Sequence, residues 1–436
     1  MSLLDFQINH QKQLLKALNN WHIALDCSDT GTGKTYTAIS VAKELNLRPI
    51  IICPKSVIYT WAKVCKQFKV EPYGILNYES VKNLNNNWYV IENDTVQRKE
   101  LKMIINNKPF KWDIKDDAII IFDEVHCCKN VGTINSKLLF SIKEQKNKAL
   151  LLSATMADKP KYFAIFSYLL GLSELSTFDI YLRMLHKNLP HIPEMKILNG
   201  LIFPEYGSRI LIKELGNRFP KNIVLPELYS MDDDIVKEIQ KQYEYINFVS
   251  EEKKEKEEKS LCILAKICYA RQKIESLKLA TIIELCKEKL ENKFSVVVFV
   301  NFLDSLKILA KEFKVENVIC GNQSLETRQK IVDDFQSNKE KIILCQIQSG
   351  GQAISLHDIH GNHPRVSIIS PGWSSKDIYQ AIGRIYRAEG KTPCLQYLVY
   401  CANTIEVQIC EIIQKKFHNY SLLTSGEESH YSIIQG

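Results

Sequence analysis

The chain has 436 residues with 57 basic and 50 acidic side chains, and 45% of its residues are hydrophobic. These values are ordinary for a globular protein with two or three domains, and they exclude a disordered or fibrous chain. The net charge of +7 suits a partner that carries phosphates, although it does not require one.

Features of membrane-bound, secreted and metal-binding proteins are missing from the sequence. No apolar run approaches the roughly 20 residues that cross a bilayer, and the first residues lack the pattern of a signal peptide. The 13 cysteines show no metal-ligand spacing, which favours reduced, buried thiols. We therefore expect a cytoplasmic or nuclear protein that is not secreted and has no membrane partner.

The first part of the chain alternates short apolar runs with stretches of helical pattern. Runs of β-branched residues without polar alternation are typical of buried parallel strands. With helices between them they predict an α/β lobe with a mostly parallel sheet, which binds ligands at the carboxyl ends of its strands. The runs are residues 23–25, 49–53, 118–122 and 149–152.

A glycine-rich loop follows the first of these runs. Its sequence, Ser-Asp-Thr-Gly-Thr-Gly-Lys-Thr over residues 28–35, lies between a predicted strand and a predicted helix, as a phosphate-binding loop does. Its glycines let backbone N–H groups surround phosphate oxygens, and the helix N-terminus adds positive charge. We expect Lys34 to contact the β- and γ-phosphates and Thr35 to hold Mg²⁺. The predicted ATP site consists of Thr30, Gly31, Thr32, Gly33, Lys34 and Thr35.

Two adjacent carboxylates, Asp123 and Glu124, follow the third apolar run. Because two carboxylates at a strand end repel each other, a bound cation is the natural compensation. We expect Asp123 to contact Mg²⁺, and Glu124 to position and deprotonate the attacking water. His126 is expected to form a hydrogen bond to a second lobe, and the alternative is a purely structural histidine.

The middle of the chain has a different composition. Residues 171–270 contain five prolines, followed by a long helical pattern from Ile235 onward. The mixed charge run at 251–259 indicates a solvated helix face or a loop, with a protein-docking helix as the alternative. We therefore expect a largely helical insertion between two lobes.

Apolar runs return after this region and predict a second α/β lobe. They are residues 294–300, 318–320, 341–345, 366–370 and 395–400. The expected domains are 1–170 for the first lobe, 171–274 for the insertion, 275–420 for the second lobe and 421–436 for a C-terminal tail.

A pair of arginines follows in the sequence Gln-Ala-Ile-Gly-Arg-Ile-Tyr-Arg at 380–387. Arg384 and Arg387 are three residues apart, so they are predicted to share one face of a helix. A guanidinium directed at the γ-phosphate neutralises charge in the transition state. We expect both arginines to act on ATP held by the first lobe, so that hydrolysis depends on lobe closure.

Taken together, these motifs resemble those of superfamily-two helicases, which have two RecA-like lobes. Further segments are similar to the Swi/Snf-like branch of DNA translocases, although Ser374-Ser375 replaces the Asn-Pro of that branch. The compact length is similar to translocase cores of large DNA viruses and phages, so a viral origin is one expectation. The similar segments are residues 53–61, 77–79, 123–130, 219–221 and 404–406, with Trp373 seven residues before Gln380.

The resemblance implies roles that the motifs alone do not assign. Gln7, in a segment similar to the Q motif, would contact the adenine edge, and a plain helix start is the alternative. Gly351 would lie against the nucleotide. His126, Ser153, Thr155 and Gln380 would couple the nucleotide site to nucleic acid. The nucleic-acid contacts would be Lys55, Ser56, Tyr78, Asn301, Gln348, Ser349, Gly350 and Trp373.

The sequence thus predicts a DNA-dependent ATPase, with ATP and Mg²⁺, that moves along duplex DNA and remodels it. The alternative is a strand-separating helicase on DNA or RNA, for which residues 171–230 have room for a separating element. An inactive ATPase scaffold is disfavoured because the charged residues of the ATP motifs are all present. A P-loop kinase or small GTPase does not explain the second lobe. The preference for DNA over RNA rests on the resemblance alone.

Overall fold

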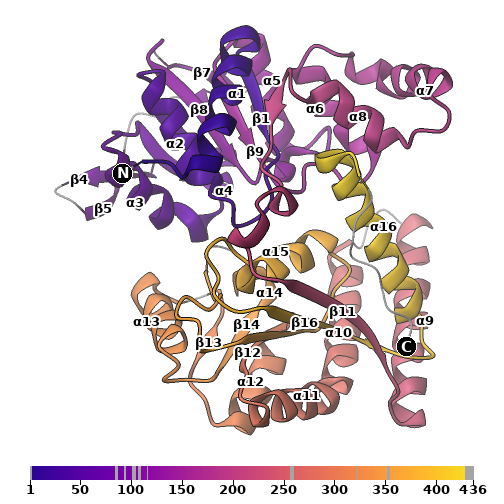
Figure 1. Cartoon of the computed structure of the whole chain (residues 1–436). Coiled ribbons are helices and arrows are strands. Elements are labelled where there is room, and N and C mark those ends of the chain that lie inside the picture. Colours follow the sequence, from indigo (N-terminus) through magenta and orange to yellow (C-terminus); the bar gives the residue numbers. More distant parts are fainter. Residues whose placement is uncertain are drawn as a thin grey trace. The chain divides into compact units, whose positions relative to one another are not determined.

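The computed structural model describes residues 2–83, 87–92, 95–100, 105–106, 110–114, 116–255, 260–321, 323–350 and 354–427. The chain forms two compact units (Figure 1). The first contains the chain up to Gly216 and again from Lys416, and the second contains Asn217–Lys415.

The first unit is built on an eight-stranded sheet in the order β10-β1-β9-β8-β2-β3-β4-β5. All neighbouring pairs are parallel except β3–β4 and β4–β5. A separate two-stranded sheet joins β6 to β7. The strands are β1 (Ile23–Asp26), β2 (Arg48–Cys53), β3 (Gly74–Asn77), β4 (Asn87–Glu92), β5 (Thr95–Glu100), β6 (Ile105–Asn106), β7 (Lys111–Trp112), β8 (Ala118–Asp123), β9 (Ala149–Leu152) and β10 (Gly207–Ser208).

Both faces of this sheet are buried, which explains the apolar runs without alternation. Ile50 and Ile52 of β2 belong to one core cluster, and Ile51 between them belongs to the other. Successive side chains of a strand point to opposite faces, so a strand covered on both sides needs apolar residues throughout. The helices of this unit up to Gly216 are α1 (Asp5–Trp21), α2 (Lys34–Glu44), α3 (Ile58–Phe68), α4 (Tyr78–Lys82), α5 (Ile134–Gln145), α6 (Ala164–Leu169), α7 (Phe178–Asn188) and α8 (Glu194–Ile202).

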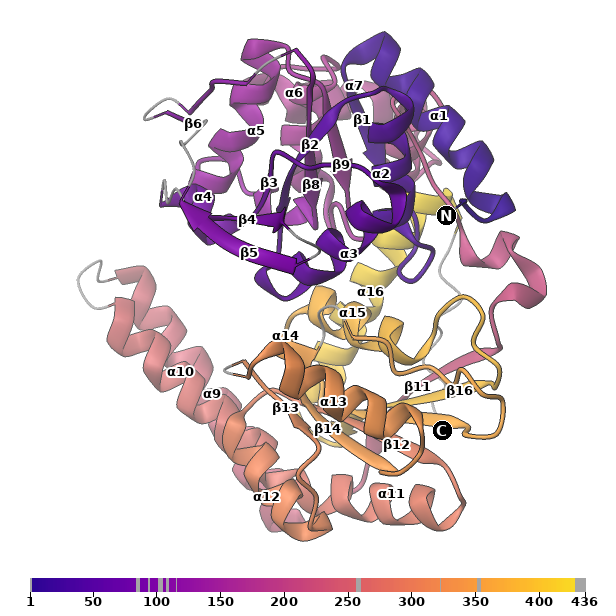
Figure 2. The same cartoon turned by 90° about the vertical axis from the view of Figure 1, so that its left-hand side faces the viewer.

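The second unit has a six-stranded, fully parallel sheet in the order β11-β16-β15-β12-β14-β13. Its strands are β11 (Asn222–Tyr229), β12 (Ser295–Val300), β13 (Val318–Ile319), β14 (Ile342–Gln346), β15 (Arg365–Ile369) and β16 (Cys394–Cys401). Its helices are α9 (Asp233–Glu255), α10 (Ser260–Leu277), α11 (Leu279–Glu291), α12 (Leu303–Phe313), α13 (Leu325–Gln336), α14 (Ile347–Gly350), α15 (Ser375–Ile385) and α16 (Glu406–Ser425). Helices α9 and α10 lie side by side as a long pair (Figure 2).

The expected insertion at 171–274 is not a separate domain, which corrects the predicted boundaries. Helices α7 and α8 and strand β10 belong to the first unit, whereas β11, α9 and α10 belong to the second. The expected tail is also partly wrong, because α16 continues to Ser425. Leu422 and Leu423 are buried in the core of the first unit, so the end of α16 returns to it.

Most of the thirteen cysteines are buried, as expected: nine are buried, two are half-buried and two are exposed. That they are reduced stays a prediction. Within the described residues, no group of His, Cys, Asp and Glu side chains could hold a metal ion by itself. A search of the helices in the described part of the chain finds none with the length and apolar character to cross a membrane.

Candidate nucleotide site and nucleic-acid contacts

Three of the predicted motifs follow neighbouring strands that end at the same level. In the order β1-β9-β8, Leu152 is the register partner of both Asp26 and Asp123. The backbone N–H of Ser153 also donates to the carbonyl of Asp26 at 3.0 Å. The phosphate-binding loop, the acidic pair and the Ser-Ala-Thr segment therefore begin along one row, at the carboxyl edge where parallel sheets bind ligands.

The phosphate-binding loop connects β1 to α2, and α2 begins at Lys34. Gly31 and Gly33 have φ angles of 82° and 89°, which glycine adopts without strain. The Lys34 ammonium donates to the backbone carbonyls of Ser28 and Asp29, at 2.9 and 3.0 Å. The loop thus holds its own lysine at the start of the helix, next to Thr35, which is half-buried on its first turn.

Gln7 is buried against this loop. Its amide nitrogen donates to the carbonyl of Thr32 at 2.9 Å, and its amide oxygen accepts from the N–H of Leu4 at 3.0 Å. A Cβ atom on Gly33 would lie 2.3 Å from the same amide nitrogen, so a larger residue would displace the Gln7 amide as well as strain the backbone at a φ of 89°. Gln7 therefore contacts the phosphate-binding loop, and its contact with adenine stays a prediction.

The acidic pair stands at the end of β8. Asp123 is the last residue of that strand, and Glu124 has a φ of 55°, which turns the chain sharply there. Burial and the neighbouring Glu124 raise the pKa of the Asp123 carboxyl to about 6, although the Trp61 indole opposes this shift. The indole N–H of Trp61 donates to the Asp123 carboxylate at 2.9 Å. Sequence reasoning missed this role of Trp61, whose only signal was its place at the end of the 53–61 segment.

His126 connects the acidic pair to the Ser-Ala-Thr segment. Its Nδ1 atom lies 3.0 Å from the Ser153 hydroxyl, 3.4 Å from the Thr155 hydroxyl and 3.2 Å from a Glu124 carboxylate oxygen. Burial alone lowers the pKa of His126, but hydrogen bonds with Cys127 and Glu124 outweigh it and raise the pKa to about 9. A positively charged imidazole thus links Glu124 to Ser153 within the first unit, and its predicted bond to the second lobe stays a prediction.

The arginine pair lies at the end of α15 in the second unit. Gln380 and Arg384 are buried within the helix, but the helix ends at Ile385. Arg387 therefore lies beyond the helix, and the prediction that both arginines share one helix face is wrong. The reason is Tyr386, which has an extended conformation and packs its ring against Phe219 at 5.3 Å. The Arg387 guanidinium donates to the carbonyl of Ile354 at 3.2 Å.

The predicted nucleic-acid contacts of the first unit differ in exposure. Lys55 is exposed and Ser56 is half-buried in the short 3₁₀ helix Lys55–Val57 that follows β2. Tyr78 is buried, and its hydroxyl donates to the backbone carbonyl of Asp123 at 2.7 Å. Tyr78 thus supports the backbone of the acidic pair, and its contact with nucleic acid stays a prediction.

The predicted contacts of the second unit lie near its carboxyl edge. Gln348 is exposed on α14, and the same helix includes Ser349 and Gly350. Gly351 lies outside the described residues. Asn301 follows β12 and is tied by its side-chain amide to Glu275 at 2.6 Å and to the carbonyl of Ser370 at 3.0 Å.

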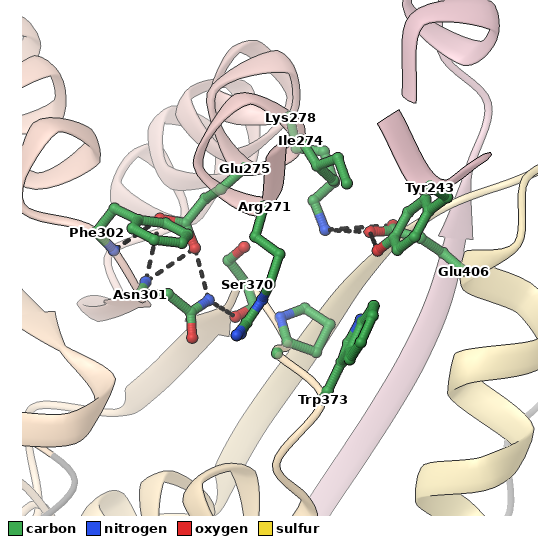
Figure 3. Close-up of a pocket in the computed structure, with 12 residues that line it drawn as sticks. Tyr243, Arg271, Ile274, Glu275, Lys278, Asn301, Phe302, Ser370, Trp373 and Glu406 are labelled. Carbon is green, nitrogen blue, oxygen red and sulfur yellow. Dashed lines mark hydrogen bonds and ion pairs between the residues drawn. The ribbon is translucent and has the colours of Figure 1, made fainter. Parts of the chain in front are cut away.

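A pocket opens beside Asn301 at this edge of the second sheet (Figure 3). Trp373 is 40% exposed there, and the Tyr243 ring stacks parallel to it with centroids 6.4 Å apart. The Arg271 guanidinium lies over the indole at 5.7 Å, and no ion pair of Arg271 is found within the described part of the chain. The pocket therefore presents an aromatic ring and a positive charge, a combination that suits a nucleic-acid strand.

Sequence reasoning missed Arg271, which lies in the expected largely helical insertion at 171–274. A signal was present: Arg271 and Glu275 are four residues apart, so they share one helix face, and Lys278 follows directly after the end of that helix, α10. That face is buried, because Glu275 accepts from the backbone of Asn301 and Lys278 pairs with Glu406 at 2.9 Å. Charged residues repeated on the inward face of a helix indicate a polar site.

Comparisons with known proteins match both units. Residues 1–158 match the family "Type III restriction enzyme, res subunit", and residues 277–389 match "Helicase conserved C-terminal domain". A protein of Acanthamoeba polyphaga mimivirus, provisionally named an ATP-dependent RNA helicase, is 38% identical over 100% of this chain and 86% of its own length. An uncharacterized ATP-dependent helicase of Mycoplasma genitalium is 24% identical over 95% of this chain and 42% of its own length.

Two further similarities are more limited. The DNA repair and recombination protein RAD54 of Saccharomyces cerevisiae is 28% identical over 33% of this chain and 16% of its own length. A solved structure of the Sulfolobus solfataricus SWI2/SNF2 ATPase core in complex with dsDNA has 17% identity and a TM-score of 0.40, covering 98% of this chain and 94% of its own. The ATP motifs lie in one row at the edge of the first sheet, and the mimivirus relative matches the whole length of this chain. The chain therefore belongs to the superfamily-two helicases, as an ATP-hydrolysing member with the sequence features of their Swi/Snf-like branch.

Proposed function

We propose that nucleic acid stimulates ATP hydrolysis by this protein, and that hydrolysis drives movement along duplex DNA. The observation that carries the proposal is the contact of His126 with both Glu124 and Ser153. Through His126, a movement of the Glu124 carboxylate is transmitted to Ser153, in the segment that follows β9. Such a link between the hydrolytic site and a second motif is what an ATPase that performs mechanical work requires.

The ATP chemistry is assigned to residues of both units. In the first unit, Lys34 contacts the β- and γ-phosphates, and Glu124 positions and deprotonates water. Asp123 and Thr35 would hold Mg²⁺, and the raised pKa of Asp123 fits this role because a divalent cation would compensate the crowded negative charge. From the second unit, Arg384 and Arg387 stabilise the charge that develops on the γ-phosphate. Bound Mg²⁺ would neutralise phosphate charge.

We assign nucleic-acid binding to contacts with the sugar-phosphate backbone of the polymer, because a protein that moves along any sequence must not depend on base edges. Lys55 and Ser56 serve this role in the first unit. In the second unit, Arg271 offers a guanidinium to the phosphates, and the exposed Trp373 indole lies under that guanidinium. The similarity of a third of the chain to a DNA repair and recombination protein supports DNA as the polymer.

Steady-state ATP turnover tests this proposal, measured at matched salt without polymer and with duplex DNA, single-stranded DNA or RNA. We expect duplex DNA to stimulate turnover most strongly, and Lys34→Ala to abolish turnover with every polymer. Arg271→Ala should weaken the stimulation and leave turnover without polymer unchanged. Arg183→Ala on α7, an exposed arginine of the first unit, is the control and should change neither value. Equal turnover with and without duplex DNA contradicts the proposal.

A second candidate is a strand-separating helicase that acts on RNA. The name of the mimivirus relative favours it, since that protein is described as an RNA helicase and matches the whole chain. The same assay separates the two functions. Stimulation by RNA or single strands, without stimulation by duplex DNA, identifies the second candidate.

A further inference from the structure

We propose that residues 206–212, through which the chain leaves the first unit, position the ATP-binding lysine. This segment contains β10 and runs beside β1 and the start of the phosphate-binding loop. The second unit begins at Asn217, so the same segment leads into the connection between the units. Its residues belong to none of the ATP motifs. The inference rests on the proposed role of Lys34 in phosphate binding.

Backbone hydrogen bonds attach the segment to the loop. The N–H groups of Leu25, Cys27 and Asp29 donate to the carbonyls of residues 206, 208 and 210, at 3.0, 3.1 and 3.0 Å. This ladder starts in β1 and continues past its end at Asp26 into the loop. A Cβ atom on Gly207 would lie 2.3 Å from the carbonyl oxygen of Leu25, so the two strands approach as closely as only glycine allows.

Two side chains of the loop strengthen this attachment. The Ser28 hydroxyl accepts from the N–H of Ile210 at 2.9 Å, and the Asp29 carboxylate accepts from the N–H of Ile212 at 2.8 Å. Asp29 thus binds the segment through both its backbone and its side chain. A hydrogen bond to a charged acceptor is stronger than one between neutral groups.

A buried histidine adds a third link, from α1. One ring nitrogen of His10 lies 2.8 Å from the Ser208 hydroxyl, and the other lies 3.2 Å from the Ser28 hydroxyl and 3.1 Å from the Asp26 carboxylate. His10, Asp26 and Ser28 are all at most 4% exposed. Burial alone raises the pKa of Asp26, but the His10 ring outweighs it and lowers the pKa. His10 therefore joins β10, β1 and the loop in a polar network with little access to water.

The lysine depends on the residues that this network holds. Its ammonium donates to the carbonyls of Ser28 and Asp29, the two residues that bind Ile210 and Ile212. A shift of residues 206–212 moves these carbonyls, and with them the ammonium. Since misplacement of a catalytic group by about 1 Å can cost ~10²-fold in rate, the segment controls how well Lys34 meets the phosphates. Ser208, His10 and Asp29 are thus positioning residues.

The experiment compares Ser208→Thr with Ser208→Val in the full chain. The two replacements have nearly the same volume, but only threonine keeps the hydroxyl that contacts His10. We expect Ser208→Thr to retain kcat/KM for ATP and Ser208→Val to lose roughly 10- to 100-fold, at an unfolding midpoint close to that of Ser208→Thr. Ser173→Ala is the control, because it removes a serine–serine hydrogen bond of the same unit away from the loop.

Each outcome has one meaning. Equal kcat/KM for the two variants overturns the inference. A loss for Ser208→Val in proportion to a loss of folded protein also overturns it, because it would show a structural role only. Ser208→Ala, the smaller change, is measured in the same series and carries the same expectation as Ser208→Val. Lys34→Ala is measured in parallel. If this variant keeps wild-type turnover, the proposed role of Lys34 fails. If Lys34→Ala loses turnover while Ser208→Val keeps a normal kcat/KM, only the positioning role of residues 206–212 is refuted.

Discussion

At the scale of single residues, the hydrolytic site is dominated by the charge of Asp123 and Glu124. These carboxylates are adjacent in the chain, and their repulsion contributes to the raised pKa of Asp123. The Trp61 indole and the His126 imidazole each donate toward one of them. Fixed donors thus orient both carboxylates at the end of β8, and the raised pKa of Asp123 shows that negative charge is crowded there.

Replacing the proposed base tests this arrangement. Glu124→Gln keeps the shape of the side chain but removes the carboxylate that takes a proton from water. We expect the variant to bind ATP with nearly normal affinity while its turnover falls by ~10²- to 10⁴-fold. Nucleotide binding and steady-state turnover are measured on the same preparation, with Glu144→Gln on α5 as the control. Turnover near the wild-type rate would mean that another group activates the water.

The charge on His126 predicts a dependence of stability on pH. Its folded pKa of about 9 is above the unfolded value of 6.5, so its contribution is fully present below pH 6.5 and is lost as the pH rises through about 9. We expect the wild type to lose roughly 3 kcal/mol of its stability advantage over His126→Gln across this range. Urea unfolding at several pH values measures it, with the exposed His191→Gln as control. An advantage that does not change with pH contradicts the assignment.

At the scale of elements, the sequence was most informative about the central strands. Five of the six residues in β2 and in β8 are buried, because the sheet is covered on both faces. Their positions could therefore be predicted from apolar runs. The three ATP motifs could be predicted for a similar reason, because loops after parallel strands meet at one edge.

Elements whose existence depends on distant partners could not be predicted. Strand β10 is two residues long and forms only because β1 lies beside it. Strand β11 contains Pro226, which argues against a central strand, yet β11 lies at the edge of its sheet, where proline is tolerated. Only their positions within motifs drew attention to Tyr78 and Trp61 in the sequence. In the structure, the side chains of both residues donate hydrogen bonds to Asp123.

Helix α16 provides a test at this scale. Its last turns contribute Leu423, which is 1% exposed, to the core of the first unit. We expect Leu423→Ala to lower the free energy of unfolding by about 2–5 kcal/mol, because it leaves a cavity. Ile412→Ala on the same helix removes a side chain that is 55% exposed and should cost at most about 0.5 kcal/mol. Equal effects of the two substitutions would show that the end of α16 is not packed as described.

At the scale of the whole molecule, the described part of the chain passes between the units near Gly216 and near Lys416. Both passages lie next to residues bonded to ATP motifs. Residues 206–212 hold the phosphate-binding loop, and Asn419 donates to the carbonyl of Asp158, whose carboxylate pairs with Lys129 after the acidic pair. The connections between the units are thus attached to the site where ATP is proposed to react.

Cooperation between the units predicts a kinetic effect of the second-unit arginines. We expect Arg387→Ala to reduce turnover by ~10³-fold or more, because it removes charge stabilisation in the transition state, while ATP affinity stays similar. Single-turnover hydrolysis and equilibrium binding separate these effects, and Arg328→Ala, which removes a guanidinium bonded to the carbonyl of Cys320, is the control. Unchanged turnover would remove Arg387 from the reaction.

The central claim is movement along duplex DNA, and displacement of a short third strand from a DNA triplex tests it most directly. The account predicts that the third strand is released when ATP is hydrolysed, that the underlying duplex stays paired, and that Glu124→Gln releases nothing. Release of single strands from the duplex, or ATP turnover that leaves the third strand bound, would contradict the claim.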